Sequence, residues 1–233
     1  MKILIIIPAY NEEQNISNLI KDLLKYDEYR IDILIINDCS TDDTSTICKH
    51  FGVKVIDLPC NLGIGGAVQT GYKYAYKNNY DIAIQVDGDG QHKPIYLGRL
   101  IIPIVNRSAD MVIGSRYIEK KGFQSSLLRR IGIQYFSRLI QFLTRQRISD
   151  PTSGFRACNS KVIELFAHRY PRDYPEPESL VYLKRNQVSI MEVPVVMQER
   201  INGKSSINLT KSIYYMIKVS LAIIIDRLRK HVV

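Results

Sequence analysis

The sequence predicts an α/β fold, a mostly parallel sheet with helices on both faces. Over the first 115 residues, short runs of branched aliphatic residues alternate with helical patterns. The strand-like runs are residues 3–7, 31–36, 53–57, 81–86 and 110–114, and the helical patterns cover 12–25, 41–50, 64–78 and 94–106. Strands that are apolar almost throughout, with helices between them, are typical of a parallel sheet covered on both faces.

Composition agrees with a globular chain. A length of 233 residues, 45% of them hydrophobic and 24% charged, fits one domain with or without a tail. Disordered, collagen-like and mucin-like chains are excluded. The four cysteines form no C-x-x-C pair, which indicates a reducing compartment. The first apolar run stops at Pro8, before Asn11 and Glu12, so we expect a buried strand there and not a signal peptide.

Capping residues mark where the expected helices begin. Asn11 precedes two glutamates, residues 40–43 read Ser-Thr-Asp-Asp, and Pro94 suits a first helical turn. After residue 115 the pattern changes. A basic amphipathic stretch (124–143) is followed by a turn segment (150–156), a helix (159–168), a Pro-rich segment (170–177), a helix (178–186), a strand (188–196) and a last helix (208–230).

The net charge of +9 is unevenly distributed along the chain. Residues 1–100 carry 10 basic and 13 acidic side chains, whereas residues 115–147 carry 8 and 1, and residues 200–233 carry 7 and 1. The first part therefore suits a metal or another cation, and the second suits an anionic partner. Nucleic acid and an anionic membrane both fit this description.

Two carboxylates follow the fourth expected strand. Asp87 and Asp89 stand at i and i+2, with Gly88 between them and Gln91 just beyond. Open α/β sheets bind ligands at the carboxyl ends of their strands, and glycine permits the tight turn that lets the side chains converge. Carboxylate and amide oxygens suit Mg²⁺ or Mn²⁺ bridging a diphosphate. The alternative is an ordinary Asx-Gly turn between strand and helix.

Two further strands deliver polar residues to the same expected edge. Asp38 lies at the end of strand 31–36, before the capping residues 40–43, and the first strand ends in Pro8-Ala9-Tyr10-Asn11-Glu12. Because parallel strands end at one edge of a sheet, we expect these side chains to share one crevice with Asp87.

An ordered set of motifs carries a family resemblance. The motifs are Pro8-Ala9-Tyr10-Asn11-Glu12-Glu13, Asn37-Asp38-Cys39-Ser40-Thr41-Asp42-Asp43-Thr44, Asn61-Leu62-Gly63-Ile64-Gly65-Gly66-Ala67, Asp87-Gly88-Asp89-Gly90-Gln91-His92, Gly114-Ser115-Arg116-Tyr117, residues 150–156, Glu192-Val193-Pro194-Val195, and Arg200-x-x-Gly203-Lys204-Ser205. Together they resemble family 2 glycosyltransferases of the GT-A fold, within the branch of dolichyl- and polyprenyl-phosphate sugar transferases. The resemblance covers residues 3–206.

The resemblance implies site residues by position. The nucleotide-sugar pocket would be lined by Pro8, Tyr10, Glu12, Asp38, Gly63, Asp87 and Gly88, with Asp38 on the base. The divalent metal would be held by Asp87, Asp89 and Gln91. The acceptor phosphate would face Arg116, Arg130, Arg200 and Lys204, and catalysis would use Asp89, Arg116 and Arg200. The chain has Asn37-Asp38-Cys39-Ser40 where the family often has Asp-Asp-Gly-Ser, which leaves the details of base contact open.

The reaction implied is an inverting transfer of a sugar (a hexosyltransferase activity) from a UDP- or GDP-sugar to a polyprenyl phosphate, in cell-envelope glycan synthesis. A phosphate acceptor is already anionic, so no strong base is needed. A sugar hydroxyl acceptor would need one, and Glu176 or Glu178 is then the candidate. A nucleic-acid-binding module is the competing hypothesis from the basic segments, but no binding motif supports it, and we expect no nucleic acid partner.

The C-terminal segment indicates how the protein would contact a membrane. Residues 213–225 are apolar but too short to cross a bilayer, and Lys218 interrupts them. A helix that packs on the core or another subunit is one interpretation, and an amphipathic helix lying on anionic lipid is the other. We expect a transferase domain at 1–206, a helix at 207–233, and a peripheral position at the cytoplasmic face of the membrane, directly or through a small membrane-embedded partner. A homo-oligomer is left open.

Overall fold

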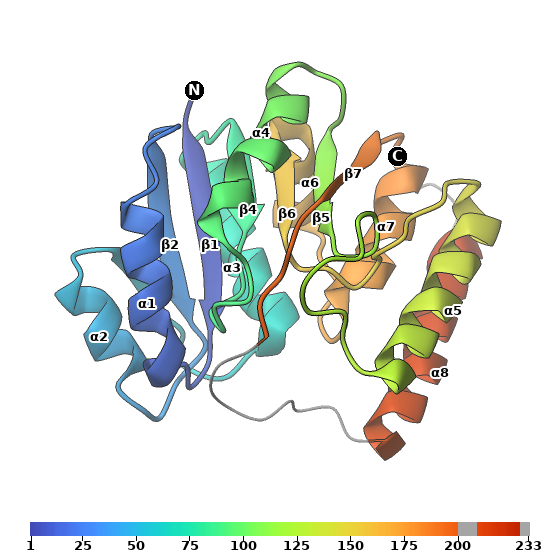
Figure 1. The fold of residues 1–233 in the computed structure, drawn as a ribbon, viewed down its shortest axis with the longest axis horizontal. Coiled ribbons are helices and arrows are strands. Elements are labelled where there is room, and N and C mark those ends of the chain that lie inside the picture. Colours follow the sequence, from blue (N-terminus) through green and yellow to red (C-terminus); the bar gives the residue numbers. More distant parts are fainter. Residues whose placement is uncertain (200–208, 229–233) are drawn as a thin grey trace.

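The computed structural model describes residues 1–199 and 209–228. Within them the strands form one seven-stranded sheet of order β3-β2-β1-β4-β6-β5-β7 (Figure 1). The strands are β1 Ile3–Ala9, β2 Ile31–Asn37, β3 Lys54–Asp57, β4 Ile82–Gln85, β5 Met111–Ser115, β6 Arg156–Asn159 and β7 Ile190–Pro194. The helices are α1 Glu13–Leu24, α2 Thr44–His50, α3 Gly63–Lys77, η1 Pro94–Tyr96, α4 Leu97–Val105, α5 Leu127–Thr144, α6 Ser160–His168, α7 Pro175–Arg185 and α8 Leu209–Leu228.

The predicted fold class is confirmed. All strand pairs are parallel except those of β6, which runs antiparallel to both β4 and β5. The sequence predicted a turn segment at residues 150–156, and β6 begins at its last residue, Arg156. Its insertion between β4 and β5 brings the turn before it to the edge where the parallel strands end.

Alternation along β1 builds the two layers of the core. Ile3, Ile5 and Ile7 pack under α1 and α4, while Leu4 and Ile6 face the opposite layer, which holds α3 and α6. Successive side chains of a strand point to opposite faces, so a strand buried on both faces must be apolar throughout. Figure 1 shows α1, α2 and α4 in front of the sheet with α3 and α6 behind it.

Two helices begin where the sequence did not place them. The expected start of α2 at residue 41 is wrong, because the preceding polar residues form a turn that bonds the segment at the start of α1, and Asp42 Oδ1 accepts from the Thr44 amide only where α2 begins. The Asn11 amide donates to Ser40 Oγ at 3.0 Å, and the Glu13 amide donates to Asp42 Oδ2 at 3.1 Å. The expected start of α7 at residue 178 is also wrong, because Pro175 occupies the first turn, where a missing N–H costs nothing.

The C-terminal helices pack on one another at the far end of the sheet. α8 lies against α7 and α5, with Val219 and Ile223 buried in the core. The ring of Tyr215 contacts Phe136 of α5 and Tyr174 at centroid distances of 5.2 and 4.4 Å. Among the described residues, no helix combines the length and apolar character that a membrane crossing requires.

A pair of helical glycines tests the packing of α3 on β1. A Cβ at Gly71 would lie 2.3 Å from Ile6 Cγ2, whereas a Cβ at Gly132 of α5 would meet nothing within 4 Å. We expect Gly71→Ala to lower the free energy of unfolding by about 1–2 kcal/mol through overpacking. Gly132→Ala should raise it by roughly 0.5–1 kcal/mol through helix propensity. Urea denaturation of both variants checks this, and a stabilising Gly71→Ala would contradict the packing.

Candidate active site

The turns after β1 and β4 meet at the point where the strand order reverses. β1 has β2 on one side and β4 on the other, and open α/β sheets bind ligands at such a switch point, beyond the carboxyl ends of the strands. A Cβ at Gly88 would lie 3.1 Å from the Pro8 carbonyl oxygen and 3.5 Å from Glu12 Cγ. Two of the three predicted strand ends are therefore in contact, and Glu12 lies beside the turn that carries Asp87 and Asp89.

Asp38 connects the third strand end to α3. Its amide donates to the Ala9 carbonyl at 2.9 Å, and its Oδ1 accepts a 2.7 Å hydrogen bond from the Leu62 amide, just before α3 begins at Gly63. Gly63 has a φ of +75°, a conformation that favours glycine. Asp38 is buried, whereas Tyr10 is half exposed. The residues predicted to line the nucleotide pocket thus share one edge of the sheet.

The backbone and carboxylate of Asp87 are held from several sides. Gln85 Nε2 donates to Asp87 Oδ1 at 3.2 Å, and the Asp87 amide donates to His92 Nδ1 at 3.1 Å. His92 is buried and stacks on Phe155 at a centroid distance of 4.7 Å. The ring therefore links the turn to the core, because it stacks on Phe155 while its Nδ1 accepts from the Asp87 amide.

Gly154 packs directly against the Asp87 carboxylate. A Cβ at this position would lie 2.8 Å from both Asp87 carboxylate oxygens and 2.9 Å from Gln85 Nε2. Gly154 belongs to the turn before β6, so the antiparallel strand closes the back of the site. A side chain there would displace the carboxylate.

The donor atoms at the turn fit a divalent cation. Asp89 Oδ1 accepts a 3.1 Å bond from the Gln91 amide, and Gln91 Nε2 donates to the Gln198 carbonyl at 3.3 Å, a bond that does not involve its side-chain oxygen. In the part of the chain that the structure describes, no three His, Cys, Asp or Glu side chains gather as a complete metal set. Mg²⁺ commonly takes one or two protein carboxylates and completes its coordination with substrate phosphates and water.

A buried cation lies behind this acidic edge. Arg156 is 1% exposed, and its guanidinium donates to Ser179 Oγ at 2.8 Å and to the carbonyls of Ser153, Pro151 and Glu176 at 2.7, 3.0 and 3.0 Å. All four acceptors are uncharged, so they do not neutralise the guanidinium. Its positive charge therefore acts on nearby ionisable groups such as Glu176. A buried charge of this kind is tolerated only when it is hydrogen-bonded and compensated.

Glu176 stands at the first turn of α7, beside that guanidinium. Burial raises the pKa of its carboxyl, and the charge of Asp87 raises it further, while Arg156 and a hydrogen bond with Gln85 oppose the shift. Gln85 is fully buried and contacts both carboxylates, since it also bonds Asp87. Of the two carboxylates considered as a base, Glu176 is thus the one linked through Gln85 to the turn that carries Asp87. Glu178 also lies in the first turn of α7.

Arg116 is engaged within the protein. Its Nε and Nη2 both lie 2.7 Å from the carboxylate oxygens of Asp150, which is fully buried. Glu192 holds this segment in turn, since its Oε1 accepts from the Asp150 amide at 2.9 Å. Burial lowers the pKa of Arg116, but the Asp150 carboxylate outweighs it, and the net shift is upward. Contact of Arg116 with an acceptor phosphate therefore stays a prediction.

The remaining predicted cations differ in position. Arg130 is exposed on the first turn of α5. Arg200 and Lys204 lie outside the described residues. Sequence reasoning missed Gln85 and Gly154, and it left the role of His92 open. The one available signal was Gln85 itself, a polar residue in an otherwise apolar buried strand.

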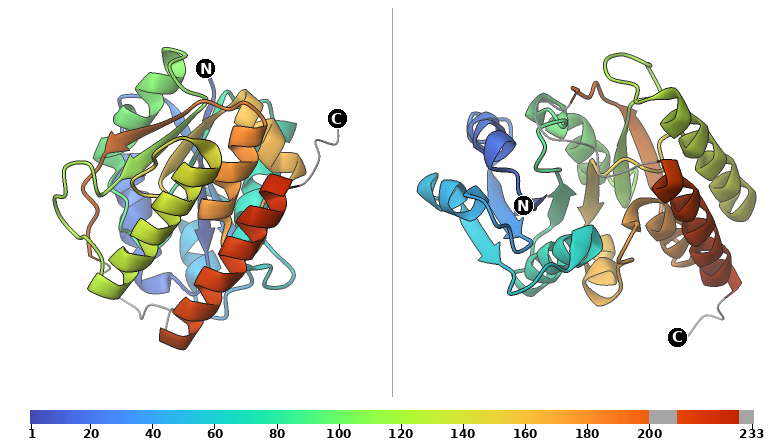
Figure 2. Two further views of the ribbon diagram at one scale, coloured as in Figure 1. Left: turned by 90° about the vertical axis from the view of Figure 1, so that its right-hand side faces the viewer. Right: turned by 90° about the horizontal axis from the view of Figure 1, so that it is seen from below.

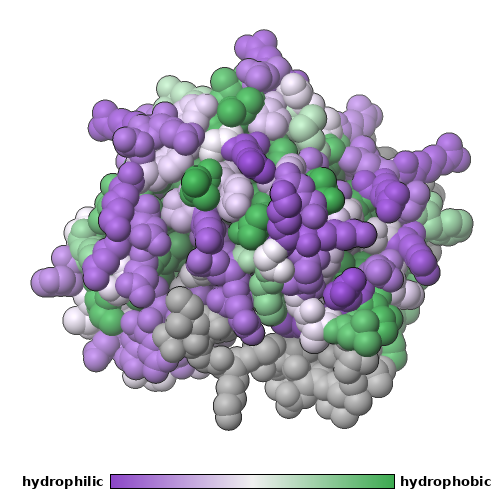
Figure 3. Space-filling model, in the orientation of Figure 1, coloured by the Kyte–Doolittle hydropathy of each residue, from purple (hydrophilic) through white to green (hydrophobic). Residues whose placement is uncertain are grey.

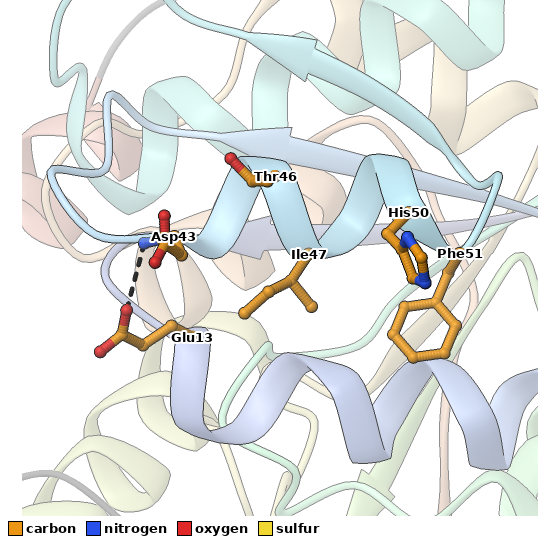
Figure 4. A pocket seen from close by; sticks show the side chains of 6 residues that line it. All are labelled: Glu13, Asp43, Thr46, Ile47, His50 and Phe51. Carbon is orange, nitrogen blue, oxygen red and sulfur yellow. Dashed lines mark hydrogen bonds between the residues drawn. The ribbon is translucent and has the colours of Figure 1, made fainter.

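A shallow depression elsewhere on the surface does not belong to this site. It lies between α1 and α2 and is lined by Glu13, Asp43, Thr46, Ile47, His50 and Phe51 (Figure 4). Ile47 and Phe51 form its apolar floor, and Glu13 Oε2 accepts from the Asp43 amide at 3.1 Å. None of the residues of the turn from Asp87 to His92 lines it.

The chain is similar in sequence to known transferases and synthases. The sequence is 34% identical over 213 residues to the UDP-N-acetylglucosamine–dolichyl-phosphate N-acetylglucosaminyltransferase of Methanococcus voltae, covering 83% of this chain and 84% of the relative. It is 28% identical to the polyprenol monophosphomannose synthase of Mycolicibacterium smegmatis, covering 88% and 80%.

Among solved structures, the glucosyl-3-phosphoglycerate synthase of Mycobacterium tuberculosis, crystallised with Mn²⁺, UDP and phosphoglyceric acid, superposes with a TM-score of 0.74 at 18% identity, over 99% of this chain and 80% of that one. At this identity the likeness concerns the fold, which is that of GT-A glycosyltransferases. The model of the family described as "Glycosyl transferase family 2" matches residues 4–166. The chain belongs to glycosyl transferase family 2.

Proposed function

We propose that this protein is a divalent-metal-dependent transferase that moves a sugar from a nucleoside diphosphate to a polyprenyl phosphate, with inversion at the anomeric carbon. The observation that carries the proposal is the turn of Asp87 and Asp89, which lies against Glu12 at the switch point of the sheet and has a buried guanidinium behind it. The acceptor class is supported by relatives whose names specify dolichyl phosphate and a polyprenol.

In this proposal the donor nucleotide lies across the carboxyl ends of β1 and β2. Pro8, Tyr10, Glu12 and Gly63 line its pocket, and Asp38 accepts a hydrogen bond from the base. Asp38 already positions the start of α3 through the Leu62 amide. A rigid carboxylate of this kind suits recognition of a base edge by a fixed acceptor. UDP- and GDP-sugars are both candidate donors.

Asp87, Asp89 and Gln91 would hold the cation, which when bound offsets the charge that grows on the departing diphosphate. The chain contributes by fixing the first of these ligands before the donor arrives. Gln85, His92 and Gly154 each restrict the position of Asp87. Groups that need no reorganisation during the reaction stabilise developing charge most effectively.

The transfer itself is a single displacement. An anionic oxygen of the acceptor phosphate attacks the anomeric carbon, the bond from that carbon to the β-phosphate oxygen breaks, and the electron pair leaves with the nucleoside diphosphate. Two anionic groups must approach each other, so cationic side chains are required to position them. We assign this role to Arg116, Arg130, Arg200 and Lys204, with Arg116 held in place by Asp150.

One observation favours a second candidate function. The raised pKa of Glu176 and its link to Asp87 through Gln85 suit a general base for a sugar hydroxyl acceptor. Glu178 is the neighbouring alternative. With a phosphate acceptor, the same raised pKa instead reduces the negative charge that the acceptor would meet.

The proposed enzyme works at a membrane because its acceptor is a lipid. We assign residues 1–206 to the transferase domain and 207–233 to a helical extension, of which α8 is the described part. We place it peripherally at the cytoplasmic face, either directly or with a small membrane-embedded partner.

Replacing a metal ligand tests the proposal. Asp89→Asn should lower the Mn²⁺- or Mg²⁺-dependent release of nucleoside diphosphate by about a hundredfold or more, because the carboxylate that holds the cation loses its charge. Release is measured with polyprenyl phosphate as acceptor, and circular dichroism checks the fold. Asp22→Asn, on the exposed side of α1, is the control. Normal turnover in Asp89→Asn would remove the assignment.

Replacing Glu176 separates the two acceptor classes. Glu176→Gln keeps the size of the side chain and removes its basicity. With a phosphate acceptor, we expect kcat to stay within about tenfold of the unmodified protein, since no base is needed. A loss of roughly 10²- to 10⁴-fold would favour a hydroxyl acceptor. Glu178→Gln, assayed in parallel, shows whether any loss belongs to Glu176.

A further inference from the structure

The Pro-rich segment of residues 170–176 contacts both halves of the candidate site. It reads Tyr-Pro-Arg-Asp-Tyr-Pro-Glu and leads from α6 into the first turn of α7. The face of the molecule drawn in Figure 3 is mainly hydrophilic, with scattered hydrophobic side chains. Two apolar rings of this segment are instead buried, since Tyr170 is 6% exposed and Pro175 lies in the core. Residues 170–176 are named the bridging segment below.

The backbone of the bridging segment lies against the first turn of α3. The Gly65 amide donates to the Arg172 carbonyl at 3.0 Å. A Cβ at Gly65 would lie 2.1 Å from that carbonyl oxygen and 2.2 Å from the Pro171 carbonyl oxygen, so only glycine permits this approach. Because α3 begins at Gly63, the segment fixes the start of the helix together with the hydrogen bond that Asp38 accepts there.

Tyr170 reaches the other half of the site through Gln85. The Tyr170 hydroxyl donates to Gln85 Oε1 at 3.4 Å, and Gln85 Nε2 donates to Asp87 Oδ1. Burial raises the pKa of Glu176, and a hydrogen bond from Gln85 opposes this rise. An ionised carboxylate only accepts hydrogen bonds, whereas a glutamine amide has one oxygen and two N–H donors. This set of partners therefore determines which way the amide faces.

The Tyr170 hydroxyl remains a donor in this environment. Burial raises the pKa of Tyr170 well above its usual value, and the charges of Glu176 and Asp87 add to the shift while Arg156 opposes it. By donating to Gln85 Oε1, the hydroxyl keeps the N–H groups of the amide on the carboxylates. Gln85 is fully buried, so loss of this donor would leave its oxygen short of a hydrogen bond in the core.

α8 holds the bridging segment from the other direction. The ring of Tyr215 packs on the ring of Tyr174 at a centroid distance of 4.4 Å, and Lys218 forms an ion pair with Asp173. In both views of Figure 2, α7 and α8 lie side by side, and in the right-hand view α7 lies between α8 and α3. The bridging segment is thus held between α8 and the two elements that carry the site.

We propose that the bridging segment positions both halves of the donor site, and that Tyr170 is a positioning residue that acts on Asp87 through Gln85. The proposal deepens the proposed function, on which it rests for the identity of the cation and the nucleotide. Tyr170 fixes the amide of Gln85, and that amide fixes the carboxylate that would hold the ion. The cation site therefore depends on a tyrosine that is not one of its ligands.

Two buried tyrosines of one aromatic cluster provide a matched test. The rings of Tyr72 and Tyr170 have centroids 5.6 Å apart, but the Tyr72 hydroxyl pairs with Cys158 Sγ. Tyr170→Phe should weaken Mn²⁺ binding in the presence of UDP or GDP by about threefold to tenfold, because one hydrogen bond that orients Gln85 is lost. Tyr72→Phe should stay within about twofold, because its hydroxyl lies outside this chain of contacts. Electron paramagnetic resonance of free Mn²⁺ measures the affinity without turnover.

A second substitution shows whether Tyr170 acts through Gln85. Gln85→Met removes the amide at similar side-chain length and should weaken Mn²⁺ binding by roughly tenfold to a hundredfold, as for other residues that hold a metal ligand. Adding Tyr170→Phe should cause no further loss, because no amide is left to orient. Circular dichroism checks the fold of each variant. Equal Mn²⁺ affinity in the unmodified protein and Tyr170→Phe would overturn the proposal, and so would losses that multiply in the double variant.

A measurement without metal separates this proposal from the transferase function. In ¹H–¹⁵N spectra, the side-chain NH₂ of Gln85 should exchange with water at least about threefold faster in Tyr170→Phe than in the unmodified protein or Tyr72→Phe. If it does so while the unmodified protein takes up no Mn²⁺ with either nucleotide, positioning by the bridging segment stands and the proposed function falls. Tight Mn²⁺ uptake that Tyr170→Phe leaves unchanged, with unchanged exchange at Gln85, gives the reverse result.

Discussion

The fixed position of the Asp87 carboxylate is the constraint on which the rest of the site depends. Gln85 bonds it from within β4, the ring of His92 accepts from its amide, and Gly154 comes so close that no side chain could replace the hydrogen. These contacts come from two segments that are far apart in the sequence. The antiparallel insertion of β6 between β4 and β5 brings Gly154 into place, so the topology of the sheet determines the geometry of the carboxylate.

Charge is organised in layers around this carboxylate. The acidic side chains lie at the edge of the sheet. A diphosphate bound there would add negative charge and would need a cation between the two. Behind them, the fully buried guanidinium of Arg156 is held by neutral acceptors and acts on Glu176 and its surroundings. The second cation near the site, Arg116, is fixed by the buried Asp150. These hydrogen bonds and ion pairs limit how far the carboxylates of Glu176 and Asp150 can move.

Local sequence patterns were enough to predict six of the seven strands and the sheet edge at which the candidate site residues meet, and contacts between distant segments account for the rest. Near-continuous apolar runs identify strands buried on both faces, and carboxylates directly after such a run fall at the ligand-binding edge. The start of α2 could not be read from the sequence, because Asp42 accepts from the first residues of both α1 and α2, and Ser40 bonds the segment before α1. The role of Gly154 was also hidden, since it depends on a residue in a different turn. Residues 124–143 looked like a basic amphipathic stretch, and the packing of α5 beside α8 could not be read from the sequence.

A crystal soaked with Mn²⁺ and a nucleoside diphosphate tests the central claim most directly, because the anomalous signal of manganese locates the ion without assumptions. The account predicts one peak bonded to the carboxylates of Asp87 and Asp89 and to the diphosphate, with the base near Asp38. A diphosphate bound elsewhere, for example in the depression between α1 and α2, with no manganese at the Asp87–Asp89 turn, would contradict it.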